Sequence, residues 1–236
     1  RVTAPGTLAA LDDAIGRCRR CPRLVAWREE VAVVKRASFS DEEYWGRAVP
    51  GFGSATPSIW VVGLAPAAHG ANRTGRMFTG DRSGDWLFGS LHRVGLATLP
   101  TSTSRDDGQS VAGVRITAAV HCAPPDNKPT PEEFAACADW LDDERALIEP
   151  TVAVVVALGG LAWTAVLRCL AAGGWSIPRP RPRFGHGSAF AAVTPEGRTV
   201  TVLGSYHPSQ QNTFTGRLTE PMLDAVLMQA RQVAGL

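Results

Sequence analysis

Four cysteines of this chain have spacings suited to holding a metal centre. Cys18 and Cys21 form a C-x2-C turn, whose two thiolates can bind one centre. Cys122 is expected at the end of a strand and Cys137 one turn into the following helix, so both can meet that turn. Spacing alone leaves zinc, an iron–sulfur cluster and chance buried thiols all open. Because the cysteine count is odd, no secretion signal is recognisable, and Cys169 is expected inside a helix core, a disulfide framework is not expected.

Three unusual polar or proline-containing segments directly follow predicted strands. Because the carboxyl ends of parallel strands meet at one edge of a sheet, we expect these segments to form a ligand site there. The segments are residues 64–66 after the strand 58–63, residues 121–127 after the strand 114–120, and residues 205–209 after the strand 199–203.

A glycine-rich loop, residues 63–84, contains further candidate side chains. Phe78 is an aromatic residue within a polar stretch, and Asp81 precedes a helix predicted to start at Ser83. Phe78 filling the core and Asp81 capping the helix are the structural alternatives. The loop matches neither G-x-G-x-x-G nor the P-loop spacing, which disfavours a nucleotide-binding enzyme.

His207 lies at a predicted strand end and is followed by a proline and small polar residues. A histidine in this position can donate a hydrogen bond to an oxygen that becomes anionic during a reaction. The structural alternative is a ring whose hydrogen bonds are satisfied by the neighbouring backbone. For an isolated histidine, that alternative is the expected one.

Length and composition exclude several classes of protein. The 236 residues are 44% hydrophobic with a net charge of +2, which argues against disorder and a coiled coil. No apolar run approaches the roughly 20 residues of a membrane helix, so a cytoplasmic protein without membrane contact is expected. Of the 24 basic residues, 22 are arginines; seven basic residues lie within 17–36, and three arginines lie within 179–183. Codon bias is one explanation for the excess of arginine over lysine, and contact with phosphates is the other.

The order of the predicted elements indicates an α/β fold. Strands alternate with helices, which is typical of a three-layer α/β/α sandwich with a central, mainly parallel sheet of four to five strands. We expect one domain over residues 1–236, with a helical N-terminal segment at about 7–36. The predicted strands are 58–63, 114–120, 151–158, 188–193 and 199–203, and helices are predicted near 83–93, from 131, near 161–171 and at 219–234.

Six motifs together resemble the uracil-DNA glycosylase superfamily, and most closely its fifth, type-b family. They cover nearly the whole chain and occur in the family's order. The motifs are GLAPA at 63–67, HG-x-N-x-T-G at 69–75, FTGD at 78–81, N-x-P-T-P at 127–131, HPS-x-x-N at 207–212 and the four cysteines.

The resemblance implies a monofunctional DNA-repair glycosylase that flips out uracil, with hypoxanthine and other damaged bases as further substrates, and leaves an abasic site. It implies a [4Fe–4S] cluster on the four cysteines that ties down the N-terminal segment, and a monomer acting on duplex or single-stranded DNA. By position, the resemblance implies that the catalytic residues are Asp81, His207 and Asn127, and that the base is bound by Gly63, Leu64, Ala65, Ala67, Phe78, Asn127 and His207. It implies that the residues entering the duplex are Pro208, Ser209, Gln210, Gln211 and Asn212. The implied cluster ligands are Cys18, Cys21, Cys122 and Cys137.

The first motif departs from most families of this superfamily because residues 63–67 carry no polar side chain. In the type-b family an aspartate at the position of Asp81 is the proposed substitute, and small Ala65 and Ala67 leave a roomier pocket. The apolar motif also keeps open a catalytically inactive iron–sulfur protein that binds DNA or senses damage. A zinc-stabilised hydrolase of another substrate is a third interpretation.

Overall fold

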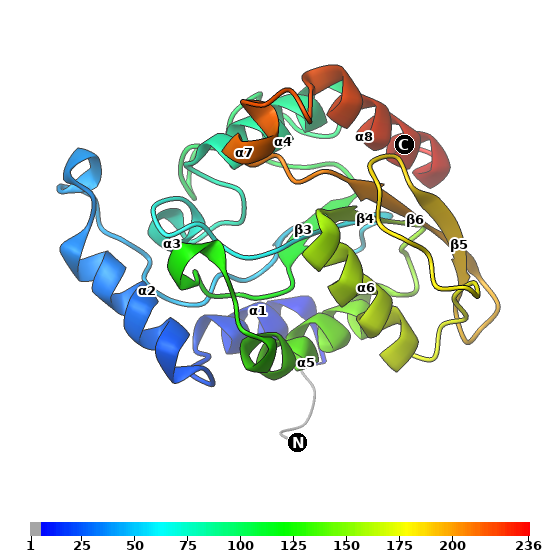
Figure 1. Cartoon of the computed structure of the whole chain (residues 1–236), viewed down its shortest axis with the longest axis horizontal. Helices are drawn as coiled ribbons and strands as arrows, with labels where there is room; N and C mark the ends of the chain where they lie inside the picture. The colour runs from blue at the N-terminus through cyan, green and yellow to red at the C-terminus, as the bar shows by residue number, and fades with distance from the viewer. Residues whose placement is uncertain (1–5) are drawn as a thin grey trace.

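A computed structural model describes residues 6–236 as a sheet lying between two groups of helices (Figure 1). Within these residues the strands are β1 (Phe52–Gly53), β2 (Ile59–Gly63), β3 (Val114–Ala118), β4 (Val154–Leu158), β5 (Ala189–Val193) and β6 (Thr199–Ser205). The helices are α1 (Leu8–Gly16), α2 (Pro22–Val34), α3 (Ala71–Thr74), α4 (Arg82–Arg93), α5 (Pro131–Ile148), α6 (Gly160–Ala172), α7 (Gln210–Thr213) and α8 (Glu220–Ala234), with short 3-10 turns at Ala37–Phe39 and Pro125–Asn127.

The described sheet has six strands in the order β1-β3-β2-β4-β6-β5. The four central strands are parallel, and β1 and β5 add one antiparallel strand at each edge. The predicted count of four to five strands was therefore wrong. The sixth strand is β1, whose two residues are too few to show an alternating pattern in the sequence.

The two faces of the sheet are covered by different helices, which confirms the three-layer sandwich. Successive side chains of a strand point to opposite faces. Ile59 and Val61 of β2 pack with residues of α4 and α8, whereas Trp60 and Val62 pack with residues of α1, α5 and α6. Figure 1 shows α4 and α8 above the sheet and α1, α5 and α6 below it. None of the helices described is both long and apolar enough to cross a membrane.

A buried ion-pair network joins three of these elements. Arg115 of β3 is 4% exposed, and its Nε donates to Glu144 of α5 over 2.5 Å, while Nη2 donates to Asp12 of α1 over 2.5 Å. Glu144 is fully buried. The Asp12 side chain is 25% exposed, whereas Glu144 has no access to water, so the guanidinium is what makes the burial of Glu144 tolerable.

Replacing Arg115 by methionine leaves Glu144 as a buried charge without its partner. We expect the free energy of unfolding in urea to fall by about 3–5 kcal/mol. The control is Arg17→Ala, which removes an exposed i,i+4 pair with Asp13 on α1 and is expected to cost at most about 1 kcal/mol. Equal losses for the two variants would show that the network contributes no more than a surface pair.

Candidate active site

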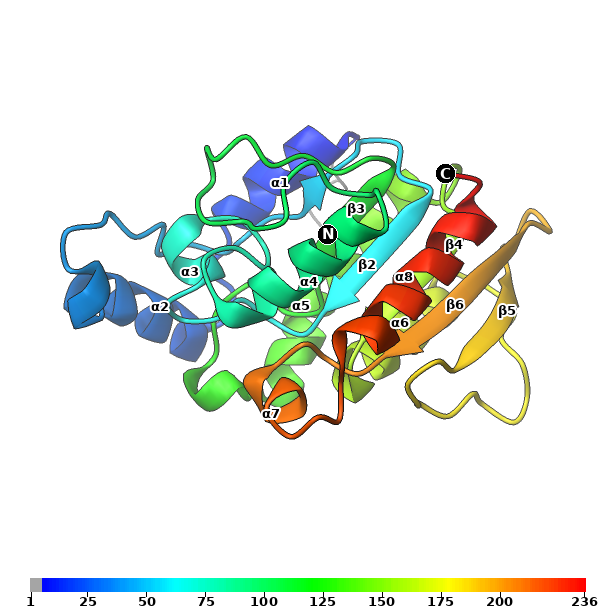
Figure 2. The ribbon, with the colours of Figure 1, turned by 90° about the horizontal axis from the view of Figure 1, so that it is seen from above.

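A cleft of about 760 Å³ opens at the carboxyl ends of the parallel strands. The three segments that follow β2, β3 and β6 all contribute to its wall, as predicted, and Figure 2 shows α7 at this end of the sheet. Gly63 and Pro208 are buried and are not part of the lining. The predicted site residues that line the cleft are Leu64, Ala65, Ala67, Phe78, Asp81, Asn127, His207, Ser209, Gln210, Gln211 and Asn212.

Phe78 lies in the cleft wall with a backbone conformation unusual for an aromatic residue. Its φ is +52°, in the left-handed region, and non-glycine residues held there cluster at functional sites. The ring lies beside the His207 imidazole, with ring centroids 5.9 Å apart. A Cβ on Gly63 would lie 2.7 Å from Phe78 Cζ, so only glycine at the end of β2 leaves room for the ring.

His207 presents an uncharged imidazole to the cleft. Burial lowers its pKa to about 4, so the ring is neutral at pH 7. Its backbone is fixed because the Asn212 side-chain amide donates to the His207 carbonyl over 2.8 Å. Within residues 6–236 no protein group hydrogen bonds to the ring, so the alternative of a ring satisfied by neighbouring backbone was wrong. The imidazole N–H is therefore available to a ligand.

Asp81 is both the N-cap of α4 and a side chain of the cleft wall. Its Oδ1 accepts a hydrogen bond from the Gly84 N–H over 3.0 Å, which confirms the capping alternative. Burial raises the pKa of the carboxyl, although the N–H groups of Gly84 and Ser83 oppose that effect. Oδ2 lies against Gly70, where a Cβ would approach it to 1.9 Å. The carboxyl is thus held in one position, with its basicity increased by burial.

Asn127 stands at the mouth of the cleft. It is exposed and ends the 3-10 turn Pro125–Asn127, in which Asp126 and Asn127 have φ of +53° and +57°. The two left-handed residues turn the chain sharply between β3 and α5. This turn leaves an exposed amide, able to donate and to accept hydrogen bonds, at the cleft entrance.

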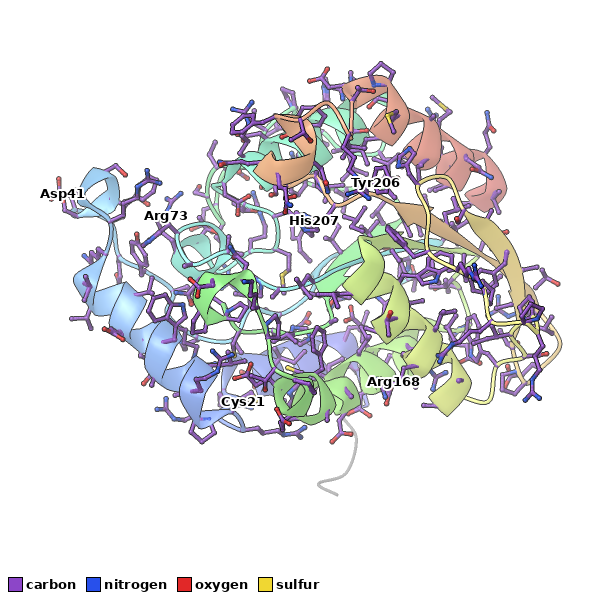
Figure 3. All side chains as sticks on the ribbon, viewed as in Figure 1. Cys21, Asp41, Arg73, Arg168, Tyr206 and His207 are labelled. Atoms are coloured by element: carbon purple, nitrogen blue, oxygen red, sulfur yellow. The ribbon has the colours of Figure 1, made fainter. Side chains whose placement is uncertain are left out.

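The four predicted metal ligands lie on the opposite side of the sheet from α8. Cys18 and Cys21 are partly exposed, Cys122 and Cys137 are buried, and all four pack against one core. Burial raises the pKa of Cys122 to about 11 and that of Cys137 to about 12. Figure 3 shows Cys21 well separated from His207.

Hydrogen-bond donors accompany these sulfurs. Arg28 Nη1 donates to Cys122 Sγ over 2.9 Å, and the His121 N–H donates to Cys137 Sγ over 3.5 Å. Four thiols, two of which accept hydrogen bonds from N–H donors, are a set that fits a thiolate-bound cluster. Among the residues described, no group of three or more Cys, His, Asp or Glu side chains is placed to hold a metal ion.

Comparison with known proteins identifies the family. Residues 50–231 match the model of the Uracil DNA glycosylase superfamily. The chain belongs to this superfamily. It is 55% identical to a type-5 uracil-DNA glycosylase of Mycobacterium tuberculosis, over 98% of this chain and 83% of the relative. Type-5 uracil-DNA glycosylases of Mycobacterium leprae (55% identical, over 98% of this chain and 97% of the relative) and Thermus thermophilus (52%, over 93% and 94%) are similarly close, which confirms the resemblance.

The cleft of this superfamily member contains side chains that sequence analysis did not select. Arg217 lies over the Tyr206 ring at 4.5 Å, and the Tyr206 and Phe184 ring centroids are 6.2 Å apart. Arg82 lies over Phe214 at 4.4 Å. Phe184 directly follows the basic cluster at residues 179–183, and this position is the one feature of the sequence that could have pointed to it. The other pairs join segments distant in sequence, and no spacing indicated them.

The two arginine clusters differ in what they contact. Within residues 17–36, Arg28 is buried and four other arginines form ion pairs, so a phosphate would have to compete with carboxylates for most of this cluster. Arg179, Arg181 and Arg183 are exposed, and none forms an ion pair with another described residue. The expectation of phosphate contact therefore narrows to the second cluster. The paired arginines are Arg17 with Asp13, Arg19 with Glu29, Arg20 with Asp139 and Arg23 with Glu133.

The lowered pKa of His207 predicts an imidazole that stays neutral across the physiological range. In NMR spectra its ring resonances, assigned with His207→Asn, should not shift between pH 8 and about pH 5.5, because the folded-state pKa is about 4. Unfolded chains bind this proton near pH 6.5, so the stability contributed by the neutral ring is present above that pH and is lost as pH falls towards 4. A titration midpoint near 6.5 in the folded protein would contradict the burial of the ring.

Proposed function

We propose that this chain is a monofunctional DNA glycosylase of base-excision repair, which extrudes uracil from DNA and hydrolyses its N-glycosidic bond, leaving an abasic site. The observation that carries the proposal is the meeting of Phe78, Asp81 and a neutral His207 in one cleft of a chain of this superfamily. A base inside a duplex cannot be attacked, so it must enter a pocket of this kind.

In the proposed complex the cleft holds the extruded base. Phe78 provides the aromatic face on which the base stacks, a contact worth about 1–3 kcal/mol in single-strand binders. The Asn127 amide donates to and accepts from the edge of a pyrimidine. Ala65 and Ala67 in the cleft wall are small. Their size supports acceptance of hypoxanthine and other damaged bases besides uracil.

Cleavage develops negative charge on the leaving base and positive charge on the sugar. The neutral His207 N–H donates to the base oxygen as it becomes anionic, as an oxyanion-hole donor does. Asp81 orients the attacking water and offsets the charge on the sugar. Its backbone hydrogen bonds hold the carboxylate in place, and its raised pKa makes it a better proton acceptor.

The surroundings of the cleft suit a DNA strand. Residues 208–212, at the start of α7, stand beside the opening and would enter the duplex as the base leaves it. Phe214 follows them and is 65% exposed. The exposed arginines of residues 179–183 and the stacked Arg82 and Arg217 provide positive charge for the phosphates. We propose that one copy of the chain acts alone on the strand.

We further propose that Cys18, Cys21, Cys122 and Cys137 hold a [4Fe–4S] cluster. When bound, such a cluster supplies a covalent cross-link and a one-electron redox centre. The hydrogen bonds that Arg28 and the His121 N–H donate to Cys122 and Cys137 support a centre bound by thiolates. Because the sulfurs come from α5 and the segments before α2 and after β3, the cluster would attach the N-terminal segment, residues 7–36, to the sheet.

Release of uracil from a duplex oligonucleotide, scored as alkali-labile breaks, tests the proposed activity. Wild-type protein should cleave, and His207→Ala should be slower by about 10²–10³-fold, the usual effect of removing one oxyanion donor. If folded wild-type protein binds the duplex without releasing a base from uracil, hypoxanthine or other lesions, the DNA-binding or damage-sensing alternative is favoured.

Asp81→Asn separates the two roles of this residue. Asparagine caps helices about as well as aspartate, so the melting temperature should stay close to that of wild type. Loss of the charge should slow base release by about 10²–10⁴-fold. The matched control is Asp85→Asn, in the first turn of the same helix but outside the cleft, which should retain activity. Unchanged activity of Asp81→Asn would leave this carboxylate with the capping role alone.

A further inference from the structure

Arg28 of α2 is a buried arginine without an acidic partner. Its side chain is 1% exposed. Nη1 donates to Cys122 Sγ over 2.9 Å and Nη2 donates to the Cys18 carbonyl over 2.9 Å. No carboxylate in residues 6–236 forms an ion pair with it, and the adjacent Glu29 is bound by Arg19 instead. Arg28 therefore directs its charge at two of the four cysteines.

This arrangement requires an anion that thiols do not provide. An arginine remains protonated in proteins, and burying a charge without a counter-charge is costly. Arg28 Nε has no hydrogen-bond partner among the described residues, so the guanidinium is incompletely satisfied by hydrogen bonds as well. Neutral thiols do not compensate a full positive charge. Four thiolates around an iron–sulfur cluster do, because the assembly carries net negative charge.

The same residue is connected to the cleft through its backbone. Asn72, which is fully buried, donates from Nδ2 to the Arg28 carbonyl over 3.2 Å. The Asn72 N–H donates to the carbonyl of Ala67, a cleft residue, over 3.0 Å. Gly70, two residues before Asn72, is the residue against which Asp81 Oδ2 lies. A short chain of contacts thus runs from the cysteines to the walls of the cleft.

We propose that Arg28 is the internal counter-charge of the four-cysteine centre. Through Asn72, it also couples this centre to the position of residues 67–72 at the cleft wall. This inference rests on the proposed cluster. Arg28 touches neither DNA nor the reacting atoms, so it is a positioning residue. One-electron reduction makes the cluster more negative, so a fixed positive charge at its ligands should favour the reduced form.

The reduction potential of the cluster tests the counter-charge directly. Purified full-length proteins are compared by iron and sulfide content and by voltammetry, in which the electrode supplies the single electron. Arg28→Gln should disfavour the reduced form at least tenfold, which is about 59 mV for a one-electron couple. Arg28→Lys, which keeps the charge, should stay closer to wild type. The matched control is Arg20→Gln, beside Cys21, because that arginine is 41% exposed and its charge is screened by solvent.

The connection to the cleft is tested with Asn72→Ala. We expect normal iron content and potential, together with a raised KM or lowered kcat for uracil release from a duplex. If Arg28→Gln fails to retain the cluster, restoration of iron content in Arg28→Lys supports the proposal, and failure of the lysine to restore it overturns it.

Three further results would overturn the inference. They are equal potentials in Arg28→Gln and Arg20→Gln, kinetics of Asn72→Ala identical to wild type, and wild-type protein that lacks iron or contains zinc. Base release by such an iron-free wild type would leave the proposed glycosylase activity standing while rejecting this role of Arg28, so the two failures are distinguishable.

Discussion

The parallel alignment of four central strands is the constraint on which the rest of the molecule depends. Ile59 of β2 is in register with Val114 of β3 and Val154 of β4, and Val154 is in register with Thr201 of β6. The carboxyl ends of β2, β3, β4 and β6 therefore meet at one edge. Segments that are far apart in sequence, those following residues 63, 118 and 205, are brought to one cleft by this register. A slip of one residue in any pair would turn its side chains to the other face.

Close backbone contacts then determine the shape of the cleft. Gly63 lets the Phe78 ring pack over the end of β2, and Gly70 lets the Asp81 carboxyl approach the turn before α3. Phe78 is held in a left-handed conformation that the surrounding structure must compensate. These close contacts fix the Phe78 ring and the Asp81 carboxylate in positions that do not depend on a ligand.

Several arginines of this chain bind carboxylates that belong to other elements, and these arginines serve the stability of the fold. Arg115 binds α1 and α5 to the sheet, and Arg23 is held by Glu133 at the start of α5. The arginines near the cleft differ, because Arg82 and Arg217 lie over aromatic rings rather than against carboxylates. Composition alone counts both groups as positive charge, whereas Arg82, Arg217 and the exposed arginines of residues 179–183 form no ion pair with another described residue.

The sequence by itself determined the fold class, the five longer strands and the starts of the longer helices, because these follow from local patterns of apolar, capping and turn residues; the four-residue helices α3 and α7 were not predicted. The helix that begins at residue 131 and the helix that follows Asp81 were predicted in this way and are present, the first with a capping box between Thr130 and Glu133. The sequence also predicted that the motifs after the strands would share one edge. The edge strand β1, the neutral state of His207, the cation–aromatic pair of Arg82 and Phe214, and the burial of Arg28 against Cys122 were decided only by the tertiary structure. Each depends on groups brought together from distant parts of the chain, whose burial and charge have no local signature.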